Sequence, residues 1–167
     1  MIPEEKAALE ALRFVIPLLE SIHVRWVITG GFACYVYGVK RKLTDIDIDI
    51  AISKDDPRFI DFMKSLEPNV TQPLKHFVSD AYDNYNLEAT ISGQIIDVCT
   101  MPDLKIFDKI AGSYKPFYEN GFPETEVVDF HGISLPLLSK KLVIDNKESI
   151  MRDEWDARDA EDLRALI

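Results

Sequence analysis

The feature that most constrains this chain is the run DIDIDI at residues 45–50, in which aspartate alternates with isoleucine. A period of two is typical of a β-strand, where residues two apart share a face. Asp45, Asp47 and Asp49 would therefore project from one face, while the isoleucines pack into the core on the other. Like charges this close repel one another, so folding alone does not favour the arrangement. A divalent cation held by oxygen ligands would offset the repulsion, which makes this strand a candidate metal site.

The residues before the acidic strand predict a turn and a helix beside it. Residues 24–29 contain the apolar run Trp-Val-Ile, which predicts a short strand, and Gly30-Gly31 follows it directly. Glycine permits positive φ and close approach of the backbone to a neighbour, although a diglycine alone is most often only a turn. Residues 31–37 predict a short helix that ends near Gly38.

A further acid stands on a later predicted strand. Residues 85–91 and 94–100 are separated by Ser92-Gly93, which predicts a β-hairpin. The second arm, QIIDVCT, carries a single acid, Asp97, among mostly apolar residues. An exposed residue on a half-buried strand is the ordinary explanation for such an acid. Its place after the Asp-x-Asp strand makes it a candidate third carboxylate at the same site.

The remaining pattern predicts an α/β fold with a small mixed β-sheet flanked by helices. Helices are expected at 3–22, 55–66, 103–111, 137–150 and 154–167, and further strands at 45–52, 74–78, 126–130 and 133–135. Pro136 is expected in the first turn of the helix that follows the last strand. Residues 113–124 are expected to form an ordered surface loop. The 167 residues suit a single domain, with a core at about 24–112 and a C-terminal hairpin and helices at about 125–167.

Composition limits the classes of protein that fit. The chain has 29 acidic and 19 basic residues and a net charge of −10, and such a surface repels a nucleic-acid backbone at long range. The N-terminus lacks the basic segment and apolar run of a signal peptide, and no stretch reaches the roughly 18 apolar residues of a membrane span. Cys34 and Cys99 lie far apart in apolar segments and are expected to be reduced thiols. We therefore expect a soluble cytoplasmic protein.

The order of these features resembles the catalytic pattern of the DNA polymerase β-like nucleotidyltransferase superfamily: a diglycine, a spacer, Asp-x-Asp, and a third carboxylate on a later strand. The similarity is greatest to small stand-alone members with the run GG-F-A-x-x-x-x-G-x-x-R-x-T-x-D-I-D. The matching positions are Gly30, Gly31, Phe32, Ala33, Gly38, Arg41, Asp45 and Asp47. Leu43 departs from the run, since it stands where those sequences carry Thr. The ending RDAEDLRAL, residues 158–166, is similar to the close of toxin-like members of the AbiEii group.

The resemblance implies the nucleotidyltransferase fold with a short helical C-terminal extension, and it implies a metal site. Attack at the α-phosphorus of an NTP expels pyrophosphate, and two Mg²⁺ ions roughly 3.5–4 Å apart offset the charge on both oxygens. Asp45 and Asp47 would bridge these ions. Asp97 would hold the ion at the nucleophile and accept its proton. Asp49 leaves a rival pair, Asp47 with Asp49, although the spacing from Gly31 favours Asp45 with Asp47.

The resemblance also implies how the phosphates of the NTP would be held. The amides of Gly30 and Gly31, at the N-terminus of the following helix, would bind the β- and γ-phosphates. Arg41 would neutralise phosphate charge with its planar guanidinium. The alternative is a surface arginine that offsets the acidic strand. Lys147, in a predicted C-terminal helix, could approach an acceptor or a phosphate, but solvation on the helix surface is the expectation.

The function implied is Mg²⁺-dependent transfer of a nucleoside monophosphate from an NTP, such as ATP, to an acceptor. Proteins that look like this one act on antibiotics, proteins or tRNA ends, often within toxin–antitoxin or phage-defence systems. The acidic composition favours a small molecule or a protein as acceptor over tRNA. One alternative is a non-catalytic nucleotide-binding or interaction module, against which the presence of all three carboxylates argues. Another is a structural domain whose acidic strand binds Ca²⁺.

Overall fold

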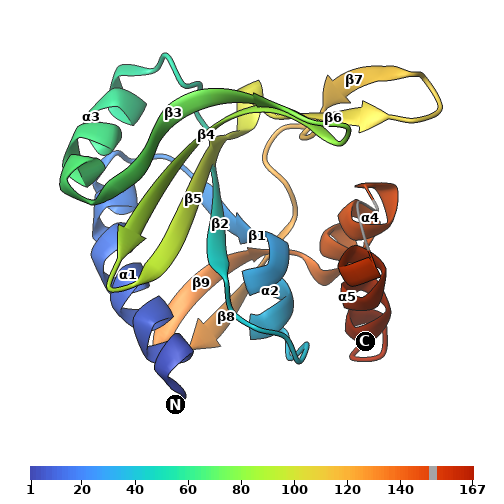
Figure 1. Ribbon diagram of the computed structural model, residues 1–167, viewed down its shortest axis with the longest axis horizontal. Helices are drawn as coiled ribbons and strands as arrows, with labels where there is room; N and C mark the ends of the chain where they lie inside the picture. Colours follow the sequence, from blue (N-terminus) through green and yellow to red (C-terminus); the bar gives the residue numbers. More distant parts are fainter. Residues whose placement is uncertain (151–153) are drawn as a thin grey trace.

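A mixed β-sheet forms the centre of the chain (Figure 1). The structure, a computed structural model, describes residues 1–150 and 154–167. Within these ranges the sheet has nine strands in the order β7-β6-β4-β5-β2-β1-β9-β8, with β3 paired to β4. The strands are β1 Trp26–Thr29, β2 Asp45–Ile50, β3 Val70–Val78, β4 Tyr82–Ile91, β5 Gln94–Thr100, β6 Lys105–Asp108, β7 Ser113–Pro116, β8 Thr125–Phe130 and β9 Ile133–Leu138. β2 runs parallel to β5 and β1 runs parallel to β9, so the mixed sheet expected from the sequence is confirmed.

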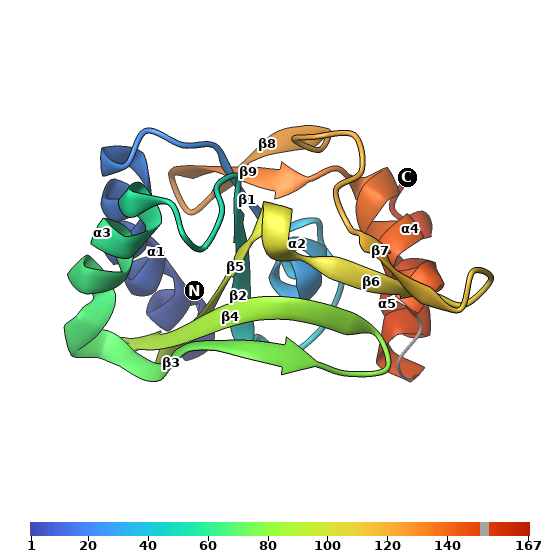
Figure 2. The same cartoon turned by 90° about the horizontal axis from the view of Figure 1, so that it is seen from above.

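Helices cover both faces of this sheet. They are α1 Pro3–Ser21, α2 Gly30–Val36, α3 Pro57–Leu66, α4 Lys140–Ile150 and α5 Glu154–Arg164. α1 and α3 lie on one side of the central strands, and α2 lies on the other side with the α4–α5 pair (Figure 2). None of the helices in the described ranges is long and apolar enough to cross a membrane.

The alternation along β2 separates two environments. Ile46 and Ile48 are 0% exposed and belong to the main hydrophobic core, together with Phe59 and Phe62 of α3 and the apolar face of α1. Full burial of each isoleucine contributes about 1.5–3 kcal/mol relative to leaving it exposed. A register slip of one residue would exchange these isoleucines for aspartates, so the core determines which face the acids occupy.

Two local predictions are confirmed in detail. The N-terminus of α3 is capped by Asp56, whose carboxylate accepts a hydrogen bond from the Arg58 amide at 2.9 Å, and Pro57 occupies the first helical position. The β4–β5 hairpin turns at Ser92 and Gly93, which have φ of 52° and 82°. The hairpin at Ser-Gly is therefore confirmed, and positive φ at both central residues is typical of a tight two-residue turn.

The predicted helix at 103–111 is wrong. The chain instead makes a short 3₁₀ turn at Met101–Asp103 and then the hairpin of β6 and β7, which takes up part of the loop expected at 113–124. Phe107 packs edge-on against Tyr114 across the two strands, with 5.3 Å between ring centroids. Pairing between strands, together with this aromatic contact, overrides a helix signal that was only local.

The expected position of Pro136 is also wrong, because it lies inside β9, opposite Val127 of β8. The fixed φ of proline suits an extended strand as well as a helix start, so the residue alone does not distinguish the two. The following helix begins at Lys140. Its N-terminus is supported by the Ser139 hydroxyl, which accepts a hydrogen bond from the Leu142 amide at 3.4 Å.

Candidate functional site

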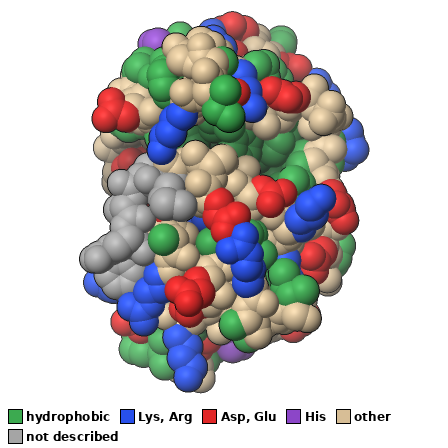
Figure 3. Space-filling model, turned by 90° about the vertical axis from the view of Figure 1, so that its right-hand side faces the viewer, with side chains coloured by type: hydrophobic (Ala, Val, Ile, Leu, Met, Phe, Trp, Pro, Cys, Tyr) green, Lys and Arg blue, Asp and Glu red, His purple; other side chains and the backbone are tan. Residues whose placement is uncertain are grey.

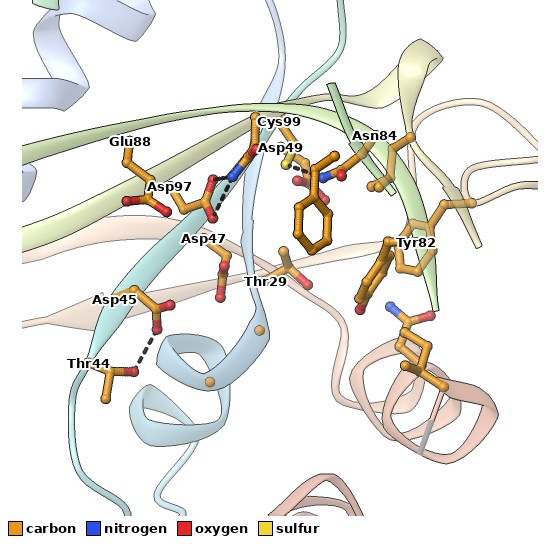
Figure 4. Close-up of a pocket in the computed structure, with 18 of the residues that line it drawn as sticks. Thr29, Thr44, Asp45, Asp47, Asp49, Tyr82, Asn84, Glu88, Asp97 and Cys99 are labelled. Atoms are coloured by element: carbon orange, nitrogen blue, oxygen red, sulfur yellow. Dashed lines mark hydrogen bonds between the residues drawn. The ribbon is translucent and has the colours of Figure 1, made fainter. Parts of the chain in front are cut away.

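Carboxylates from two strands meet on the face of the sheet that carries α2, α4 and α5. β2 and β5 are parallel neighbours, and their register places Asp47 beside Asp97. Asp45 and Asp49 share this face because they lie two residues to either side of Asp47. Figure 4 shows Asp45, Asp47 and Asp97 gathered on one side of the sheet. We call Asp45, Asp47 and Asp97 the carboxylate cluster.

The carboxylate cluster is electrostatically unfavourable without a cation. Burial raises the pKa of Asp47 well above its usual value, and the charges of Asp45, Asp97 and Asp49 raise it further. Burial also raises the pKa of Asp97 to about 6, although a hydrogen bond from Asn86 lowers it. A nearby positive charge would favour the ionised form of both groups. The cluster is therefore suited to binding a cation.

The diglycine allows the start of α2 to approach this cluster. Gly30 has φ of 63°, and a Cβ placed on it would lie 1.8 Å from Asp47 Oδ2. A Cβ on Gly31 would lie 2.5 Å from the Cζ atom of Arg41. The positive φ and the close approach of Asp47 both disfavour a side chain at Gly30, whereas a side chain at Gly31 would displace only the end of the flexible Arg41 side chain.

Asp49 is engaged by a side chain from outside the two strands. The Tyr118 hydroxyl donates a hydrogen bond to Asp49 Oδ2, and Asp49 is only 4% exposed. Burial raises the pKa of Asp49 to about 7, and the hydrogen bond from Tyr118 opposes this change. Asp45, by contrast, accepts a hydrogen bond from the adjacent Thr44 hydroxyl at 2.6 Å. Asp49 is therefore held by a contact inside the protein, whereas Asp45 bonds to its neighbour in the sequence.

Near the carboxylate cluster lies a group of paired charges, which we call the cation cluster. It consists of Arg41, Lys147 of α4, and Asp156 and Asp159 of α5. Arg41 forms an ion pair with Asp159. Lys147 Nζ lies 2.9 Å from Asp156 Oδ1 and 3.1 Å from Asp159 Oδ2, and its side chain is 11% exposed. The expectation of a solvated Lys147 is therefore wrong. Arg41 pairs with Asp159 of α5 instead of offsetting the acidic strand from the surface.

Sequence reasoning did not predict the pairing of Lys147, because its partners come from a different helix. A lysine on an amphipathic helix usually points into solvent. The available signal was the acidic ending of the chain, which contains Asp159, but nothing in the sequence linked that ending to Lys147 or Arg41.

Both clusters border one cavity of about 470 Å³. Its lining includes Gly30 and Gly31, the carboxylate cluster, Arg41 and Lys147, and polar side chains of β3 and β4. The volume falls within the range usual for small-molecule and cofactor sites. The lining combines acidic, basic and amide groups, so different parts of the cavity suit different parts of a polar ligand.

The donor atoms of the carboxylate cluster fit a hard divalent cation. Mg²⁺ and Ca²⁺ prefer carboxylate oxygens, and the cluster supplies such atoms from Asp45, Asp47 and Asp97. Within residues 1–150 and 154–167, no three His, Cys, Asp or Glu side chains already lie close enough together to hold a metal ion. The carboxylates repel one another when no cation is bound. A bound cation would offset this repulsion and so draw them together.

Comparison with solved structures identifies the fold. A candidate nucleotidyltransferase from Thermotoga maritima superposes with a TM-score of 0.71 at 22% sequence identity, over 99% of this chain and 94% of that one. The chain has the nucleotidyltransferase fold. The lincosamide antibiotic adenylyltransferase LnuA, bound to lincomycin, gives a TM-score of 0.60 at 16% identity over 93% of this chain and 96% of that one. ANT(2″)-Ia in complex with adenylyl-2″-tobramycin gives 0.56 at 16% identity, over 93% and 85% of the two chains.

At the level of sequence, no protein-family model matches this chain, and no curated protein matches it. The nucleotidyltransferase fold is therefore recognised through three-dimensional structure.

Proposed function

We propose that this protein transfers a nucleoside monophosphate from an NTP to an acceptor. The observation that carries the proposal is the position of Asp47, which lies beside Asp97 on the neighbouring strand and against Gly30 at the start of α2. The nucleotidyltransferase fold supports the same conclusion, since adenylyltransferases are among the proteins that share it.

In this proposal Asp45, Asp47 and Asp97 hold two Mg²⁺ ions. Bound Mg²⁺ would offset the negative charge on the attacking and leaving oxygens. Asp97 would accept the proton of the acceptor hydroxyl, and burial, which raises its pKa to about 6, makes it a stronger base than an exposed aspartate. Asn86 donates to both carboxylate oxygens of Asp97 at 3.4 Å, which orients this group.

The phosphates of the NTP would lie between the diglycine and the cation cluster. The Gly30 and Gly31 amides would donate to phosphate oxygens, and Arg41 lies close enough to Gly31 to contact the same group. Lys147 would add a second positive charge from α4. Asp159 would position both cations, since it pairs with each of them.

The acceptor in this proposal is a small molecule or a protein. Figure 3 shows the α4–α5 side of the molecule, where acidic and basic side chains are interspersed and do not form one basic field. With a net charge of −10, such a surface is poorly suited to a long nucleic acid. A cytoplasmic toxin–antitoxin or defence setting, suggested by the resemblance of residues 158–166 to AbiEii proteins, belongs to this proposal as well.

The test is incubation of the purified chain with Mg²⁺, each α-³²P-labelled NTP, and cell extract as a source of acceptors. We expect transfer of label with at least one NTP and its loss in Asp47→Asn. Asp61→Asn, an exposed substitution on α3, is the matched control and should retain transfer. Equal labelling by the wild type and Asp47→Asn would contradict the catalytic proposal. Binding of NTP without any transfer would support the non-catalytic module instead.

A further inference from the structure

Three side-chain amides on the β3–β4 side of the cavity have a buried polar atom without a hydrogen-bond partner in the described ranges. These atoms are Gln72 Nε2, Asn84 Oδ1 and Asn86 Oδ1. Asn84 and Asn86 are each 8% exposed, and all three residues line the same cavity as the carboxylate cluster. A buried polar group that lacks a partner destabilises the protein, so several at one cavity point to a ligand that supplies the missing partners.

The neighbours of Gln72 and Asn86 determine how their amides are oriented, whereas Asn84 takes the orientation seen in the structure. Asn86 Nδ2 donates to both oxygens of Asp97, and the opposite orientation would place its carbonyl oxygen against a carboxylate. Gln72 Oε1 accepts from Lys75 Nζ at 2.5 Å, which leaves Nε2 as the unpaired end. Asn84 Nδ2 donates to Cys99 Sγ at 3.2 Å, so its oxygen is likewise unpaired. The cavity therefore presents two free acceptors and one free donor from this group.

The amides lie on the far side of the carboxylate cluster from the diglycine. The sheet order β1-β2-β5-β4, with β3 beyond β4, places Asp47 and Asp97 between Gly30 and the three amides. Attacking and leaving oxygens stand in line on opposite sides of the phosphorus during nucleotidyl transfer. If pyrophosphate leaves towards the diglycine, as the proposed function requires, then the attacking group enters from the β3–β4 side.

We infer that Gln72, Asn84 and Asn86 form the acceptor subsite, and that the acceptor is a small neutral or cationic molecule rich in hydroxyl or amino groups. Two of the three unpaired atoms are carbonyl oxygens, which require hydrogen-bond donors. Glu88, beside Asp97 in the sheet register, adds a further carboxylate to this side of the cavity. A phosphorylated acceptor would bring negative charge to these same groups. The inference rests on the proposed function, because that function specifies which side of the phosphorus the acceptor occupies.

The test is a two-step NMR titration of the full chain with ¹⁵N labelling. A non-hydrolysable NTP with Mg²⁺ is added first, and binding is measured without any acceptor. The probes then added are myo-inositol, its diamino relative 2-deoxystreptamine, and hexa-O-methyl-myo-inositol, which keeps the oxygens but has no donors. We expect the first two probes to shift the side-chain amide signals of Gln72, Asn84 and Asn86, and the methylated probe to leave them unchanged.

Variants establish which groups make the contacts. Asn84→Leu and Gln72→Met each remove one amide at similar size, and each should weaken binding of the donor-rich probes by about three- to tenfold, the usual effect of one neutral hydrogen bond. The affinity for the NTP should change less than twofold in both variants. Asn120→Leu, at an exposed position, is the matched control and should bind the probes as the wild type does.

The two steps separate the possible failures. Absence of NTP binding in the first step would contradict the proposed function before any probe is added. Normal NTP binding without a response to either donor-rich probe would overturn the acceptor inference and leave the proposed function standing. Equal binding of the methylated probe at the same amide signals would overturn it as well.

Discussion

The carboxylate cluster and the cation cluster border one cavity, yet their charges are balanced in different ways. Asp45, Asp47 and Asp97 repel one another, and the pKa of Asp47 is raised partly for that reason. In the cation cluster each positive group has an acid beside it: Arg41 pairs with Asp159, and Lys147 pairs with both Asp156 and Asp159. The cation cluster is therefore complete within the protein, whereas the carboxylate cluster requires positive charge from outside.

This difference predicts that substitutions in one cluster reduce mainly activity and that substitutions in the other reduce mainly stability. Removing one acid from the carboxylate cluster relieves repulsion, so it should impair catalysis without unfolding the protein. Removing one acid from the cation cluster leaves buried cations short of a partner, so its first effect should be on the fold. The predictions below test this contrast, from the largest expected effect to the smallest.

Asp97→Asn should give the largest effect on activity. It removes the proposed proton acceptor and one metal ligand while keeping the size of the side chain, so transfer should fall by about 10²–10⁴-fold. The free energy of unfolding should stay the same or rise, because burial and the charges of Glu88 and Asp45 disfavour the ionised Asp97. Transfer rates and urea denaturation measure the two quantities. If Asp97→Asn lowers the unfolding free energy enough to explain the lost activity, the two clusters do not differ in the way proposed.

Asp159→Ala should give the largest effect on stability. Asp159 is 2% exposed and pairs with both Arg41 and Lys147, so its removal should cost about 3–5 kcal/mol of unfolding free energy. Asp162→Ala on the same helix is the matched control. Its carboxylate lies 3.9 Å from Arg158 at the surface, and its removal should cost about 1 kcal/mol or less. Similar costs for the two variants would show that the buried pairing does not support the fold.

The two clusters also differ in how far they could be predicted from the sequence. The carboxylate face of β2 follows from a two-residue period within six residues, and Asp97 from a hairpin with an evident Ser-Gly turn. The cation cluster joins Arg41 to Asp159, 118 positions apart, so no local period reveals it. The wrong helix at 103–111 has the same cause, since β6 depends on pairing with β4 and β7. Patterns within one element were predictable from the residues alone. The placement of Asp97 beside Asp47 was expected only through the family resemblance, and the contacts of the cation cluster were not expected at all.

Gly30→Ala tests the approach of α2 to the carboxylate cluster. A side chain at a φ of 63° costs about 1–2 kcal/mol, and the added Cβ would also overlap Asp47 Oδ2. Gly93→Ala is the matched control, because its φ is 82° but nothing lies within 4 Å of the new atom. Denaturation should show a larger loss for Gly30→Ala, and NTP affinity should fall in that variant alone. Equal losses with unchanged NTP affinity would mean that the diglycine serves only as a turn.

Mg²⁺ should stabilise the protein through the carboxylate cluster alone. At a free Mg²⁺ concentration ten times its dissociation constant, binding to one site in the folded state adds about 1.4 kcal/mol to the unfolding free energy. Thermal unfolding with and without EDTA measures this gain, and Asp47→Asn should reduce it. Asp162→Ala should retain the full gain, because it leaves the cluster intact. A gain that survives in Asp47→Asn would place the cation elsewhere, and the repulsion among the three acids would then have to be relieved by protonation.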